Sequence, residues 1–70
     1  MNLNEIKNLS EDELGLLIEK TIKVKKANQF NDYYLDLLTN GTYLISVDEN
    51  PVEVCLNESV ALKRFDEITS

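Results

Sequence analysis

The sequence predicts a small α+β domain in the order helix, helix, β-hairpin, helix, with a two-stranded ribbon packed on the helices. Three patterns predict this class. Apolar residues recur at helical spacing through residues 11–39, alternate with polar residues through 42–57, and return to helical spacing after Asn57. A chain of 70 residues has room for one hydrophobic core, so we expect residues 1–70 to form a single domain.

The first helix is predicted to begin after Ser10. Ser10 and Glu13 have the spacing of a capping box, in which each side chain accepts a hydrogen bond from the backbone N–H of the other residue. Four lysines gather further along, where cations favour the end of a helix dipole: Lys20, Lys23, Lys25 and Lys26. We therefore expect this helix to continue to about Ala27.

A second helix is predicted over residues 31–39. Tyr33, Tyr34, Leu37 and Leu38 recur at helical spacing, and Gly41 suits the left-handed residue that follows a helix end. One long helix over residues 11–39 is the alternative, because the segment between the two helices contains neither Pro nor Gly to force a break.

The period changes to two after Thr42, which predicts a β-hairpin with Asp48-Glu49-Asn50-Pro51 as a four-residue connection. Pairing Val47 with Val52 would place six apolar side chains on one face of the ribbon: Tyr43, Ile45, Val47, Val52, Val54 and Leu56. The opposite face would be mostly polar and exposed, with Leu44 beside Cys55.

The last helix is predicted to start after Asn57, a favourable N-cap residue. Apolar side chains at helical spacing are expected to face the core from this helix: Ala61, Leu62, Phe65 and Ile68.

The residue types argue against an enzyme and against a metal site or other cofactor. The chain has no His, the commonest general base and the commonest metal ligand, and its one Cys cannot make a zinc or iron–sulfur site alone. Cys55 lies among apolar strand neighbours that would not activate a thiolate, so it is expected to be structural. No Gly-rich phosphate-binding loop is present, because Gly15 and Gly41 are isolated.

Charge is unevenly distributed along the chain, which carries a net charge of −6. Residues 1–30 hold five lysines and five acids, so the whole excess lies in residues 31–70. These acids, together with Leu44, are the predicted partner-binding residues: Asp32, Asp36, Asp48, Glu49, Glu53, Glu58, Asp66 and Glu67.

The function predicted from these observations is that of a non-catalytic protein-binding module, a small regulatory or inhibitory protein that docks on a larger protein. One alternative is an acidic mimic of nucleic acid that blocks the basic groove of a nucleic-acid-binding enzyme. In size and acidity the chain is similar to phage-encoded inhibitors such as anti-restriction and anti-CRISPR proteins, although no residue pattern is shared. A homodimeric structural protein is the second alternative, since a small core gains stability from association.

Direct binding to nucleic acid is not expected, because a net charge of −6 repels phosphates despite the lysine cluster. The single cysteine disfavours a secreted, disulfide-stabilised domain. The first residues show neither the basic stretch nor the apolar run of a signal peptide, and no segment is apolar enough to span a bilayer. We therefore expect a cytoplasmic protein without membrane contact.

Overall fold

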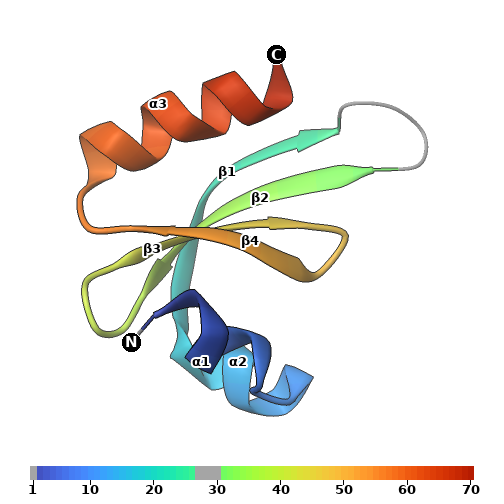
Figure 1. Ribbon diagram of the computed structural model, residues 1–70, viewed down its shortest axis with the longest axis vertical. Coiled ribbons are helices and arrows are strands. Elements are labelled where there is room, and N and C mark those ends of the chain that lie inside the picture. The colour runs from blue at the N-terminus through green and yellow to red at the C-terminus, as the bar shows by residue number, and fades with distance from the viewer. Residues whose placement is uncertain (1, 27–30) are drawn as a thin grey trace.

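The computed structural model describes residues 2–26 and 31–70 and contains one four-stranded antiparallel sheet, whose strands follow chain order β1-β2-β3-β4 (Figure 1). Three helices flank it. The elements are α1 (Leu3–Lys7), α2 (Glu11–Leu17), β1 (Ile18–Lys26), β2 (Asp32–Leu38), β3 (Tyr43–Val47), β4 (Asn50–Cys55) and α3 (Glu58–Thr69). Helices and strands are both present, but the predicted arrangement around a two-stranded ribbon is wrong.

The start of α2 was predicted correctly and its end was not. Ser10 Oγ accepts from the N–H of Glu13 at 3.2 Å, and Glu13 Oε1 accepts from the N–H of Ser10 at 3.2 Å, so the capping box is confirmed. The helix ends at Leu17, and Ile18 begins β1. β1 is rich in β-branched residues, which pack well on a pleated surface and lose rotamer freedom in a helix.

Both predictions for residues 11–39, two helices or one, are wrong because residues 32–38 form β2, an inner strand of the sheet. Helices pack on both faces of this strand, so its apolar residues do not alternate with polar ones. Leu35, Leu37 and Leu38 fit helical spacing as well as they fit an apolar strand. The predicted connection at residues 27–30 lies outside the described residues.

The predicted hairpin corresponds to β3 and β4, the outer half of the sheet, in a different register. Asp48 and Glu49 make a two-residue turn, Val47 lies opposite Asn50, and a bulge near Val52 shifts the pairing. The predicted four-residue connection and the pairing of Val47 with Val52 are therefore wrong. Ile45 lies opposite Glu53 and Leu44 opposite Val54, so the six apolar residues do not share one face.

Two hydrophobic clusters, one on each face, hold the sheet between helices. On one face α3 contributes Ala61 and Phe65, which pack against Leu35, Ile45 and Cys55. The prediction for this helix is confirmed at its start, where Asn57 Oδ1 accepts from the N–H of Val60 at 2.9 Å, and at the two buried residues Ala61 and Phe65. On the other face Ile6 of α1 packs with Leu38 and Leu44.

The helices cover the two faces unequally. The helix α3 has 12 residues and lies along one face, whereas α1 and α2 have 5 and 7 residues and lie together at one end of the molecule (Figure 1). A stretch of the second face beyond α2 therefore stays open. No helix in residues 2–26 and 31–70 is both long and apolar enough to cross a membrane.

Candidate functional site

A cleft of about 320 Å³ lies on the sheet face that α2 covers only in part. This volume falls in the usual range for small-ligand sites, roughly 300–1,000 Å³. Strands β1 to β3 form its floor, α2 forms one wall, and the β3–β4 turn contributes one rim residue. The cleft is lined by Glu11, Leu14, Gly15, Ile18, Thr21, Tyr34, Asp36, Leu44, Ser46 and Glu49.

Sheet register brings the floor residues together from three strands. Thr21 lies opposite Asp36, and Asp36 lies opposite Leu44 on its other side. Tyr34 lies opposite Ser46 one step along the same face. Because side chains two apart on a strand share a face, these five residues form a continuous patch on the side away from α3.

Asp36 is the floor residue with the most unusual environment. The residue is only 5% exposed, and its Oδ1 accepts a hydrogen bond from Thr21 Oγ1 at 2.6 Å. Burial raises the pKa of the Asp36 carboxyl above its ordinary value, and the hydrogen bond from Thr21 opposes part of that rise. An ionised carboxylate at this position is poorly solvated, and a cation placed beside it would favour the ionised form.

Glu49 reaches the rim from a turn that does not suit its residue type. Asp48 has a φ of 49° and Glu49 a φ of 72°, the left-handed conformation that two-residue hairpin turns normally assign to Asn or Gly. Asp48 Oδ1 accepts from the N–H of Asp32 at 2.8 Å and fastens the turn to the start of β2. The turn thus places Glu49 at the rim of the cleft despite an unfavourable backbone conformation.

The described residues provide no arrangement typical of catalysis by a thiolate or a metal. Cys55 is buried, and burial and the nearby Glu53 raise the pKa of its thiol, so the reactive thiolate is disfavoured. Across residues 2–26 and 31–70, no group of three or more His, Cys, Asp or Glu side chains is placed to hold a metal ion. What the cleft offers is carboxylates beside apolar and aromatic surface.

The structure places two of the predicted partner-binding acids, Asp36 and Glu49, in the cleft. Leu44 is part of its floor but is 1% exposed, so the predicted exposed face around Leu44 does not exist. The reason is the four-stranded sheet, which places α1 and α2 over the face that a ribbon would have left bare. Of the remaining predicted residues, Asp32, Asp48 and Glu58 do not line the cleft.

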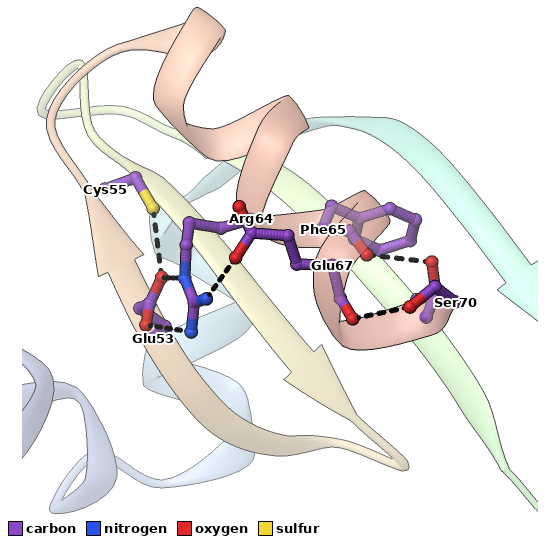
Figure 2. Close-up of polar contacts among 7 residues, drawn as sticks. Glu53, Cys55, Arg64, Phe65, Glu67 and Ser70 are labelled. Carbon is purple, nitrogen blue, oxygen red and sulfur yellow. Dashed lines mark hydrogen bonds and ion pairs between the residues drawn. The ribbon is translucent and has the colours of Figure 1, made fainter.

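Two further predicted acids, Glu53 and Glu67, are engaged by one arginine (Figure 2). Arg64 donates from Nε to Glu53 Oε2 at 2.7 Å and from Nη2 to Glu53 Oε1 at 3.0 Å, which is a bidentate pair between α3 and β4. It also donates from Nη1 to Glu67 Oε2 at 2.8 Å. The two bonds from Arg64 to Glu53 lower the pKa of the Glu53 carboxyl and tie α3 to β4, whereas the bond to Glu67 lies within α3.

The last predicted acid, Asp66, pairs with a lysine of β1. Lys23 Nζ lies 3.1 Å from Asp66 Oδ1 and 5.7 Å from the centre of the Phe65 ring. Lys25 Nζ donates to the backbone oxygen of Thr69 at 3.0 Å. These two members of the predicted basic cluster therefore fasten an edge strand to α3.

The sequence predictions missed several cleft residues, chiefly Glu11, Thr21 and Tyr34. Glu11 belongs to the neutral first part of the sequence, residues 1–30, but α2 places it in the lining of the same cleft as Asp36 and Glu49. Thr21 and Tyr34 were assigned to helices. The β-branched content of residues 18–24 was the one sequence signal that could have placed Thr21 on a strand.

Comparison with known proteins supplies no relative from which a function could be transferred. No protein-family model matches the chain, and no curated protein or solved structure is detectably similar to it. Function is therefore inferred from the geometry of the cleft.

Proposed function

We propose that the protein is a non-catalytic binding module that docks on a larger protein and receives a basic part of that partner in the acidic cleft. The observation that carries this proposal is the composition of the cleft. The acidic residues Glu11, Asp36 and Glu49 line the cleft together with apolar residues that include Leu14 and Ile18. Basic side chains combine an apolar stem with a cationic head, so they match both parts of this lining.

The placement of two carboxylates against local preference supports a binding role. Asp36 gives up hydration on an inner strand, and Glu49 adopts a positive φ that disfavours a long side chain. Conflicts between local preference and structure are concentrated at functional sites in proteins. An acidic residue at each of these positions is unfavourable for stability, which supports a role for its charge.

The arrangement of charges favours a docking module over an acidic mimic of nucleic acid. A mimic of nucleic acid needs many unpaired carboxylates spaced like the phosphates of the backbone. In this protein Glu53, Glu67 and Asp66 are instead paired with basic residues, on the sheet face opposite the cleft. Acids that line the cleft instead gather around a single concave site. This concentration supports recognition of one basic feature on a protein partner.

The proposed setting is the cytoplasm, with a larger protein as partner and no direct contact with nucleic acid or membrane. Cys55, buried as a thiol, supports a reducing environment. The net charge of −6 supports a basic partner surface and opposes phosphate groups.

This proposal is tested by capturing the partner from a lysate of the source cell with variants of the protein that carry equal net charge. The bait is the full chain as wild type, as the rim variant Glu11→Gln/Glu49→Gln, and as the control Glu5→Gln/Glu19→Gln. Both variants remove two charges. A glutamine at position 5 keeps the capping box that Glu5 makes with Asn2.

The captured protein is purified, and its affinity for each form is measured at several salt concentrations. We expect the rim variant to bind about fivefold or more weakly than the control, since two rim charges contribute roughly 0.5 kcal/mol each. Binding of the wild type should weaken steeply with salt. Equal affinities of the rim and control variants for the partner would refute docking at the cleft.

A further inference from the structure

We infer that the cleft selects an arginine side chain of the partner protein, whose guanidinium pairs with Asp36 beside Tyr34. This inference rests on the proposed function and names the chemistry of its site. Asp36 supplies the carboxylate, Thr21 fixes the orientation of that carboxylate, and Tyr34 lines the cleft two residues along the same strand face.

Asp36 is a nearly buried carboxyl group for which the described chain provides no cation. It accepts its hydrogen bond from the neutral Thr21 hydroxyl, and the salt bridges of the described residues involve other carboxylates. Lys23 and Lys25 of the neighbouring strand make their contacts with α3 on the opposite side of the sheet. Within the described part of the chain Asp36 has a neutral hydrogen-bond donor but no cationic partner, so a cation that pairs with it would come from another molecule.

Burial of the carboxyl favours arginine over lysine as that cation. With Asp36 5% exposed, the partner's cationic group must shed much of its hydration to make contact. Guanidinium is more weakly hydrated than ammonium and can donate two parallel hydrogen bonds to one carboxylate. Tyr34 adds an aromatic ring to the same cleft, and guanidinium groups stack on aromatic rings readily.

The remaining lining fits the rest of an arginine side chain. Leu14 and Ile18 provide apolar surface for the methylene stem, which is the part of the side chain that gains from burial. Glu11 and Glu49 contribute further negative charge to the lining, where they attract the incoming cation and raise its local concentration. The volume of about 320 Å³ admits one long side chain rather than a folded segment.

NMR titration with single-residue probes tests the inference without the partner. The probes are N-acetyl-arginine amide, N-acetyl-lysine amide and N-acetyl-citrulline amide, the last being a neutral analogue close in shape to arginine. The protein is the full chain as wild type, Asp36→Asn and Glu5→Gln. In Asp36→Asn the side-chain amide oxygen can still accept from Thr21, and amide signal dispersion shows whether the variant is folded.

Arginine amide should shift the backbone signals of Thr21, Tyr34, Asp36 and Ser46. Its affinity for the wild type should be about fivefold or more higher than that of lysine amide, and its affinity for Asp36→Asn should be about tenfold or more lower than for the wild type. Glu5→Gln should bind arginine amide within about twofold of the wild type. Citrulline amide should produce no saturable shift at the cleft.

Three results would overturn the inference: arginine shifts outside the cleft, equal affinity for the arginine and lysine probes, or unchanged affinity in a folded Asp36→Asn. None of these results contradicts the docking proposal if the rim variant Glu11→Gln/Glu49→Gln binds the captured partner more weakly than the control. Conversely, a rim variant that captures the partner normally refutes the docking proposal whatever the titration shows. The two failures are therefore distinguishable.

Discussion

Replacement of Phe65 by alanine should leave this protein largely unfolded. Phe65 is 0% exposed and packs from α3 into the cluster that contains Leu35 and Ile45. Truncating a buried phenylalanine costs about 3–5 kcal/mol, because transfer energy is lost and a cavity remains. A single core of this size rarely supplies more than roughly 3–5 kcal/mol of net stability. The cost of truncating Phe65 is therefore comparable to the free energy of unfolding of the whole protein.

Urea unfolding of the full chain, followed by far-UV circular dichroism and tyrosine fluorescence, measures this effect. Phe65→Ala should show little or no folded baseline, whereas Phe65→Leu should unfold cooperatively at a lower urea midpoint. Val60→Ala is the matched control, since Val60 lies on the same helix and is 48% exposed, and it should change stability by less than about 0.5 kcal/mol. A Phe65→Ala protein within about 1 kcal/mol of wild type would refute the packing of α3 described above.

Four further predictions concern ionisation, capping and the turn. Burial raises the pKa of the Asp36 carboxyl in the folded state, so ionisation of Asp36 lowers the free energy of unfolding as pH rises through that pKa. Urea midpoints should therefore show Asp36→Asn more stable than the wild type near neutral pH. In acid, where Asp36 is protonated, this advantage should disappear. The pKa of the Glu53 carboxyl is lowered in the fold, so Glu53 should stabilise the protein above the ordinary glutamate pKa and lose this effect as acid protonates it in the folded state. By the same assay, Glu53→Gln should lower the free energy of unfolding at neutral pH and change it little in acid. Asn57→Ala should cost about 1 kcal/mol in the free energy of unfolding, because α3 loses its N-cap, and equal midpoints would contradict that role. Glu49→Gly should stabilise the turn by about 1 kcal/mol while weakening partner binding, as calorimetry of the purified pair would show.

Signals confined to a few neighbouring residues predicted local structure well. Ser10 and Glu13 set the start of α2, and Asn57 set the start of α3, because a cap depends on a side chain and a backbone N–H only three residues apart. Alternation also located the two strands β3 and β4. The sequence does not reveal the two-residue Asp48-Glu49 turn, because a glutamate is an unusual residue at a positive φ.

The candidate site could be predicted only in part. Acidity identified Asp36 and Glu49 as residues of interest, but not their meeting with Glu11, which depends on α2 folding over the sheet. Sequence also could not separate the acids that line the cleft from the acids that pair with basic residues of the chain. Glu53 and Asp66 differ from the cleft acids in pairing across the interface between α3 and the sheet, with Arg64 and Lys23 respectively, and Glu67 pairs with Arg64 within α3.

The sequence by itself determined the caps, the alternating strands around the hairpin, the excess of acid and the absence of histidine. Only the tertiary structure decided that β1 and β2 form strands. The apolar residues of β2 satisfy helical and extended spacing equally well, and β1 is a mostly exposed edge strand whose extended form depends on pairing with β2. That choice also set the surroundings of Asp36. On a helix it would have been one more solvated acid, whereas on an inner strand between Thr21 and Leu44 it becomes a nearly buried carboxyl at the floor of a cleft.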